Sequence, residues 1–171
     1  MKNNYFDLSL AEQRLVMEQT AIRLSLPVQA VEKDLWVTAM LQIMFGLPCA
    51  GNLVFKGGTS LSKVWELINR FSEDIDLAID RSQFNLEGDL TKKGVKKLRK
   101  ASSVFVREEL CHQLQEAVNN TPLAPHLRPT HDDATGCCGA SHQRRCPMGD
   151  HQPSPFHIDQ YAGCGLHAGC T

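Results

Sequence analysis

Residues 55–63 read Phe-Lys-Gly-Gly-Thr-Ser-Leu-Ser-Lys, and residues 72–77 read Ser-Glu-Asp-Ile-Asp-Leu. The first stretch begins on the apolar run Leu53–Phe55, which predicts a short buried strand. After the glycine pair, residues 61–68 have helical spacing, and this predicts a helix with an inward face. Residues 71–80 alternate between apolar and polar side chains, which indicates a second strand. The inward face of the predicted helix consists of Leu61, Val64, Trp65 and Ile68.

The turn between the first strand and the helix has the composition of a phosphate-binding loop. Glycine allows the backbone to approach a phosphate closely, and a helix N-terminus supplies N–H groups and a positive dipole. Lys63, about one helical turn later, would add a positive charge. An ordinary glycine turn without a ligand is the alternative, because the stretch matches neither of the common nucleotide-binding glycine motifs. The candidate phosphate-binding residues are Gly57, Gly58, Thr59, Ser60 and Lys63.

Asp74 and Asp76 lie two residues apart on the second predicted strand, so both side chains project from one face. Two adjacent carboxylates repel each other unless a cation neutralises them, and hard divalent ions such as Mg²⁺ prefer oxygen ligands. The alternative is the solvated face of an edge strand, where such alternation is common. The nearby glycine turn favours the metal-binding interpretation.

The remaining pattern predicts helices over residues 8–24, 28–45 and 91–118. Ser9 and Glu12 form a capping box at the first helix, and Ser25 and Pro27 suit the start of the second. Gly94 weakens the start of the last stretch, which suggests two helices there. The resulting order predicts an α+β domain with a small mixed sheet flanked by helices.

Six cations occur within the nine residues 92–100, a density suited to binding the phosphates of an RNA. The alternative is a solvated helix face balanced by Glu108, Glu109 and Glu116. The six cations are Lys92, Lys93, Lys96, Lys97, Arg99 and Lys100.

The composition changes near residue 120. Residues 1–120 contain 15 basic and 15 acidic side chains, whereas residues 121–171 contain no Lys or Glu but five of the seven Cys and six of the seven His. Only five Leu, Ile, Val or Met residues occur in this second part, too few to offset the entropy of folding it. We therefore expect a folded part over residues 1–120 and a disordered or out-of-frame tail over residues 121–171. Asp132 and Asp133 are further carboxylates there, in a setting untypical of a strand.

Targeting signals are not recognisable. Residues 1–12 are polar and unlike a secretory signal, and the longest apolar stretch, residues 35–47, is too short to span a bilayer. We expect a cytoplasmic protein without a membrane association.

The two central motifs together resemble the signature of the AbiEii/AbiGii-type nucleotidyltransferase toxins, within the DNA polymerase β-like nucleotidyltransferase superfamily. The matching segments are residues 55–63 and 70–77, and residues 31–37 resemble the segment that precedes the first motif. The resemblance covers roughly residues 25–115. Recognisable counterparts of the family's later carboxylate, basic motif and helical C-terminal domain are lacking after about residue 120.

The resemblance implies a minimal nucleotidyltransferase fold in which the turn over residues 57–60 holds the triphosphate. It implies Asp74 and Asp76 as the catalytic pair that holds two Mg²⁺ ions. It also implies a toxin of a toxin–antitoxin or abortive-infection system, which has an antitoxin partner and transfers a nucleotide from a nucleoside triphosphate to RNA, such as a tRNA 3′ end. The alternative is a catalytically inactive fragment that binds nucleotide or an antitoxin.

Overall fold

The computed structural model describes residues 4–68, 75–86, 88–125, 127–132, 137–142 and 156–158. Helices α1 (Leu10–Leu24) and α2 (Val28–Met44) precede strand β1 (Leu53–Lys56), helix α3 (Gly57–Lys63) and strand β2 (Asp76–Ile79). The 3₁₀ turn η3 (Arg81–Phe84) leads to α4 (Lys92–Val104), the π-helical segment η4 (Phe105–Leu110) and α5 (Cys111–Asn119). The 3₁₀ turns η1 (Tyr5–Asp7) and η2 (Ala50–Asn52) precede α1 and β1. This mixture of helices and strands confirms the α+β class.

The strands of the described residues form two separate groups. β1 and β2 form an antiparallel pair, and β3 (Leu127–Asp132), β4 (Cys137–His142) and β5 (Phe156–Ile158) pair antiparallel in that order. The parallel pairing that a mixed sheet would require is thus not among the described elements. Asp132 ends a strand, contrary to the expectation for its setting, while residues 133–136, 143–155 and 159–171 of the expected tail lie outside the described residues.

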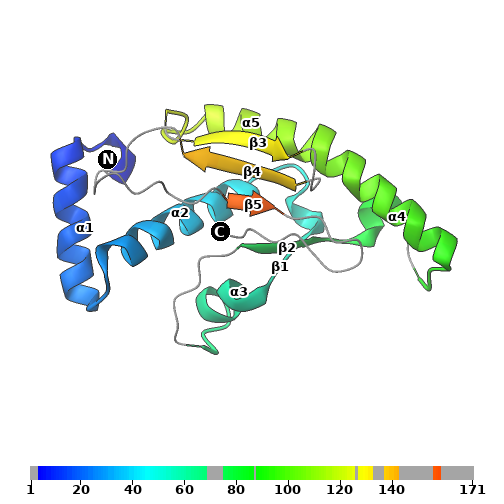
Figure 1. Cartoon of the computed structure of the whole chain (residues 1–171), viewed down its shortest axis with the longest axis horizontal. Helices are drawn as coiled ribbons and strands as arrows, with labels where there is room; N and C mark the ends of the chain where they lie inside the picture. The colour runs from blue at the N-terminus through cyan, green and yellow to red at the C-terminus, as the bar shows by residue number, and fades with distance from the viewer. Residues whose placement is uncertain are drawn as a thin grey trace.

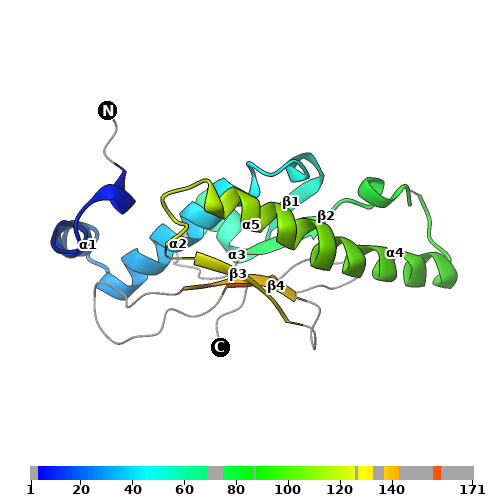
Figure 2. The same ribbon diagram turned by 90° about the horizontal axis from the view of Figure 1, so that it is seen from above.

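The segments α4, η4 and α5 run on as one long rod, in which the α5 half lies above β3 and β4 and α4 extends beyond them (Figures 1 and 2). Two α-helices, α4 and α5, occupy the stretch as expected, but Gly94 does not separate them. Gly94 lies in the first turn of α4, where its N–H donates to the Thr91 Oγ1 cap at 3.3 Å. At η4 the backbone makes the wider turn of a π-helix instead of a break.

The core lies between α2, the rod and one face of the β1–β2 pair. Its fully buried side chains come from all three, and they exclude water from the space between the helices. Leu123 and Leu127 also belong to this core, at 5% and 3% exposure, so packed residues continue beyond residue 120. The fully buried core residues include Val37, Met40, Met44, Leu77, Val106, Leu110, Leu114 and Val118.

Capping fixes both ends of α1. Ser9 and Glu12 form the predicted capping box, and the hydrogen bond from the Ser9 hydroxyl holds the pKa of the Glu12 carboxyl below its usual value. Ser25 does not cap α2 as expected, because it terminates α1 in the left-handed conformation, at φ 54°. Pro27 takes the cap position of α2, without a side-chain hydrogen bond.

Helix α3 begins and ends earlier than the sequence predicts. It starts at Gly57 and ends at Lys63, and Glu66 then turns the chain at φ 52°. The predicted inward face is wrong for Leu61, Val64 and Trp65, which are 40%, 59% and 64% exposed. The helical spacing of these residues therefore does not produce a buried face, since the helix stops before it could form one.

Candidate active site

The register of β1 and β2 places Lys56 directly opposite Asp76. Opposite residues of an antiparallel pair point to the same face, and their Cβ atoms lie about 5 Å apart. Phe55 and Leu77, one position along, point to the other face and contribute to the core. Lys56 and Asp76 therefore share the outer face of the pair, with a lysine next to the predicted catalytic carboxylate.

Asp76 is nearly buried although it is on this outer face. Only 8% of the residue is exposed, because the start of α3 lies against it. Gly57 has a φ of +75°, and a Cβ atom added to it would lie 1.8 Å from Asp76 Oδ2 and 2.8 Å from Asp76 Cβ. The structure thus brings the glycine turn and the second strand into direct contact, at a distance that only glycine permits.

Asp80, at the other end of the same strand, provides the contrast. It is exposed, and its carboxylate accepts a 2.8 Å hydrogen bond from the Ser82 N–H at the start of η3. The hydrogen bonds from Ser82 hold the Asp80 pKa below its usual value. Asp80 therefore fits the interpretation of a solvated strand edge, whereas the burial of Asp76 does not.

The hydroxyl residues of the turn are turned into the protein. Thr59 is 1% exposed and Ser60 is 3% exposed, and the Ser60 hydroxyl donates to the Phe55 carbonyl oxygen at 3.2 Å. This bond ties the first turn of α3 to β1. What the turn presents outward is therefore the backbone of its glycines and the N-terminal end of α3, where a helix concentrates N–H groups and positive potential.

Lys63 is tied to α2. Its Nζ lies 2.6 Å from Asp34 Oδ1 and donates to Thr38 Oγ1 at 3.1 Å. The ion pair with Asp34 therefore joins α3 to α2 through two residues that are 29 positions apart in the chain. Among the interactions found in the described residues, none joins the Lys63 ammonium to Asp76 or to the glycine turn.

Asp74, the second predicted catalytic carboxylate, falls within residues 69–74, outside the described residues, as does Arg70 of the segment 70–77. Two residues that sequence reasoning did not assign to the site are Lys56 and Thr38, the first opposite Asp76 and the second bonded to Lys63. The strand pattern alone could not reveal Lys56, because its position depends on the register of β1 against β2.

A metal site would have to be built around Asp76. In the described part of the chain no three His, Cys, Asp or Glu side chains cluster closely enough to hold an ion. The chemistry of the Asp76 carboxylate nevertheless fits Mg²⁺, which prefers oxygen ligands, and the missing side chain at Gly57 leaves backbone against that carboxylate.

The helices of the described residues were compared with the length and apolar character of membrane-spanning helices. None of those in the described ranges combines the length and the apolar character that a bilayer-spanning helix requires.

Comparison with known proteins gives one result. Neither curated proteins nor solved structures yield a match. The family described as "Nucleotidyl transferase AbiEii toxin, Type IV TA system" matches residues 42–134, which include β1, the glycine turn, β2 and the rod and amount to more than half of the chain. The chain therefore belongs to the AbiEii family of nucleotidyltransferase toxins from type IV toxin–antitoxin systems.

Proposed function

We propose that this protein transfers a nucleotide from a nucleoside triphosphate to a hydroxyl group of an RNA, and that Asp76 is a catalytic residue of the reaction. One observation carries the proposal: the Asp76 carboxylate is buried against Gly57 at the start of α3. A carboxylate on a solvated strand edge would not require this contact. Membership of the AbiEii family supplies the reaction class.

In the proposed site, Asp74 and Asp76 hold Mg²⁺, and the turn formed by Gly57, Gly58, Thr59 and Ser60 binds the triphosphate. Because the Thr59 and Ser60 side chains are buried, the turn would act through its backbone N–H groups and the dipole of α3. Lys63 would stabilise the position of this turn, because its ammonium binds Asp34 and Thr38 and so fixes α3 against α2.

The reaction is an in-line displacement at the α-phosphorus. A hydroxyl oxygen of the acceptor gives its proton to water and forms the new bond to the α-phosphorus. The bond from the α-phosphorus to the bridging oxygen breaks, and pyrophosphate leaves with the electron pair. Bound Mg²⁺ ions would supply charge stabilisation at the attacking and leaving oxygens. The protein's own part is to hold the two carboxylates in position, and Gly57 does this for Asp76 by allowing the close contact.

The test compares Asp76→Asn with Asp80→Asn in the full chain. Both variants remove one negative charge from β2 or its end, but only Asp76 contacts the glycine turn. We expect Asp76→Asn to lower Mg²⁺-dependent incorporation of labelled nucleotide into tRNA roughly a hundredfold or more, and Asp80→Asn to leave it within a few-fold. Thermal unfolding of each variant checks that both still fold.

Full incorporation by Asp76→Asn would refute its catalytic role. Thermal stabilisation by nucleoside triphosphate and Mg²⁺ without incorporation into any RNA would instead indicate a chain that binds nucleotide and does not catalyse transfer. The type IV toxin–antitoxin family implies an antitoxin partner. The proposed reaction belongs in the cytoplasm, where its nucleotide and RNA substrates are found.

A further inference from the structure

The outward face of α4 is a continuous positive surface. Lys92, Lys93, Lys96, Lys97, Arg99 and Lys100 are all exposed and lie opposite the buried Leu98. Helical spacing arranges them in two adjacent rows of three, because residues at i, i+4 and i+7 align along a helix. The rows are Lys92, Lys96 and Arg99, and Lys93, Lys97 and Lys100; we call the six residues the α4 basic face.

The acidic residues of the rod do not neutralise this face. Glu108 pairs with Arg107, and Glu116 lies 3.8 Å from His112. Within the described ranges, no ion pair involves any residue of the α4 basic face. The alternative of a solvated helix face agrees with the exposure of the six cations, but Glu108 and Glu116 have other ion-pair partners.

The α4 basic face also opposes the stability of its own helix. Lys92 and Lys93 occupy the first turn, where the positive end of the helix dipole disfavours cations. Like charges at i and i+4, such as Lys92 with Lys96 and Lys93 with Lys97, repel each other. The folded chain thus gains nothing from concentrating these charges here, and a bound polyanion would relieve the repulsion.

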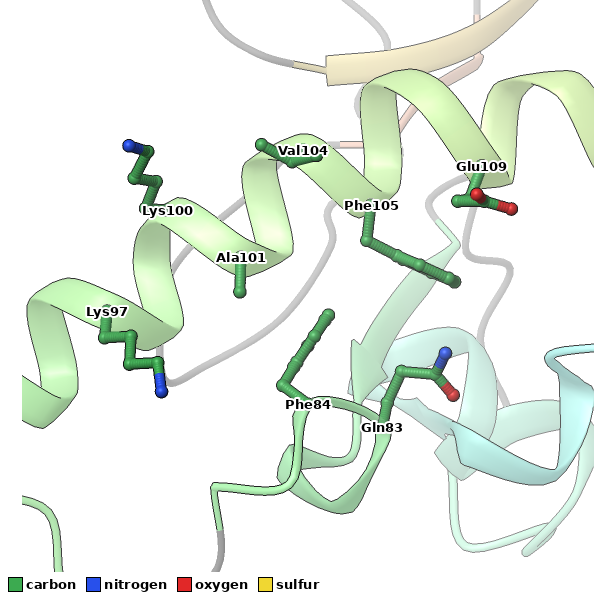
Figure 3. A pocket seen from close by; sticks show the side chains of 8 residues that line it. All are labelled: Gln83, Phe84, Lys97, Lys100, Ala101, Val104, Phe105 and Glu109. Carbon is green, nitrogen blue, oxygen red and sulfur yellow. The ribbon is translucent and has the colours of Figure 1, made fainter.

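A pocket beside the face indicates which polyanion fits. The pocket has a volume of about 450 Å³ and lies between η3 and the rod. Phe84 points from η3 toward Ala101 and Phe105 on the rod, and Lys97 extends on the same side of the helix as Phe84 (Figure 3). The Phe84 and Phe105 rings pack edge to face at 5.8 Å. The remaining lining residues are Gln83, Lys100, Val104 and Glu109.

Phe105 belongs to the core, so the partly exposed Phe84 supplies the aromatic surface of this pocket. A partly exposed aromatic ring next to a row of lysines suits unpaired RNA, in which bases stack on rings and phosphates contact cations. An acidic protein surface would need the lysines but not the aromatic pocket. We infer that the α4 basic face and the Phe84 pocket form a binding surface for RNA that contains unpaired bases. The inference rests on the proposed function in taking this RNA as the acceptor.

The position of this surface suits an acceptor site. η3 begins directly after Asp80, which follows the end of β2, and Asp76 is at the start of β2. Four residue steps in a strand span roughly 13 Å. The start of η3 therefore lies roughly 13 Å along the chain from Asp76, a separation that one RNA molecule can span.

The experiment measures the affinity of the full chain for labelled tRNA and for a single-stranded RNA at several salt concentrations, without nucleotide. The variant Lys93→Gln/Lys97→Gln/Lys100→Gln removes the row next to the pocket. The matched control Arg14→Gln/Arg23→Gln/Arg107→Gln removes the same charge from other exposed positions. We expect the first variant to bind RNA at least tenfold more weakly. The slope of its log affinity against log salt concentration should become shallower by about two to three. The affinity of the control should change about twofold or less.

Phe84→Leu tests the pocket. It keeps an apolar side chain against Phe105 but removes the aromatic plane, so binding of single-stranded RNA should weaken while the salt dependence stays unchanged. If both triple variants bind RNA equally, or Phe84→Leu has no effect, the inference is wrong. It is also wrong if polyglutamate, but not RNA, requires the α4 basic face, because the partner would then be an acidic protein.

Asp76→Asn separates this inference from the proposed function. It should bind RNA like the unchanged chain and fail only in nucleotide transfer. A chain that never transfers a nucleotide, yet loses RNA affinity when the row of three lysines is neutralised, would refute the proposed function and support the RNA-binding surface.

Discussion

At the scale of single residues, Gly57 and Gly88 form a natural pair for comparison. Both have a φ of +75°, but a Cβ atom on Gly57 would collide with Asp76, whereas one on Gly88 would meet nothing within 4 Å. We expect Gly88→Ala to cost about 1–2 kcal/mol through backbone strain alone. Gly57→Ala should carry the same strain and, because it displaces the Asp76 carboxylate, reduce nucleotide incorporation as strongly as Asp76→Asn does.

Chemical denaturation and incorporation assays on the two alanine variants measure these effects. The comparison isolates the contact, since the backbone strain is common to both positions. The two variants are compared by their activity per folded molecule. If Gly57→Ala and Gly88→Ala lose the same fraction of this activity, the contact between Gly57 and Asp76 has no part in catalysis.

At the scale of elements, the pair of Lys63 and Asp34 fastens α3 to α2. Both side chains are partly exposed, at 25% and 46%, so the coupling between them should be about 0.5–1 kcal/mol. A double-mutant cycle with Lys63→Met and Asp34→Asn measures it through unfolding free energies. We expect non-additive losses of stability and similar, small increases in the KM for nucleoside triphosphate for both variants.

The same cycle distinguishes a structural Lys63 from one that contacts phosphate. A lysine that binds the triphosphate would raise the KM when replaced, while Asp34→Asn would leave the KM unchanged or lower it by releasing the lysine. Such a result would support the nucleotide-binding role that the sequence predicts for Lys63.

The elements also show how far sequence reasoning extends. An apolar run and local alternation were sufficient to predict β1 and β2, as at Leu53 and Leu77. The predicted second strand covered residues 71–80, whereas β2 spans Asp76–Ile79 and residues 71–74 lie outside the described residues. The start of α3 was not predicted from the sequence, because two glycines indicate a turn. In the structure, Gly57 and Gly58 instead form the first turn of the helix. The partners of Asp76 and Lys63 lie 20 and 29 positions away, and no local pattern encodes such contacts. The predicted roles of Asp74 and Asp76 remain predictions.

At the scale of the whole molecule, the core extends past the composition boundary at residue 120. Leu123 and Leu127 are buried, whereas Leu10 is 65% exposed. Leu123→Ala and Leu127→Ala should each lower the free energy of unfolding by about 2–5 kcal/mol, and Leu10→Ala by less than about 0.5 kcal/mol. Denaturant titration of the full chain measures all three. Equal, small effects would place the end of the folded unit at residue 120, as the composition suggests.

The wide turn of η4 has a consequence for the molecule as a whole. An unbroken α-helix would place Leu98 and Leu114 about 160° apart around its axis, although both are buried. The wider π turn reduces this angle by roughly the rotation of one α-helical residue, about 100°. It therefore brings Leu98 and Leu114 toward the same side of the rod. The six residues of η4 thus set the phase between the two halves of the rod. Loss of a single residue there, such as the exposed Arg107, would leave every lysine of α4 in the sequence and aim them all in another direction.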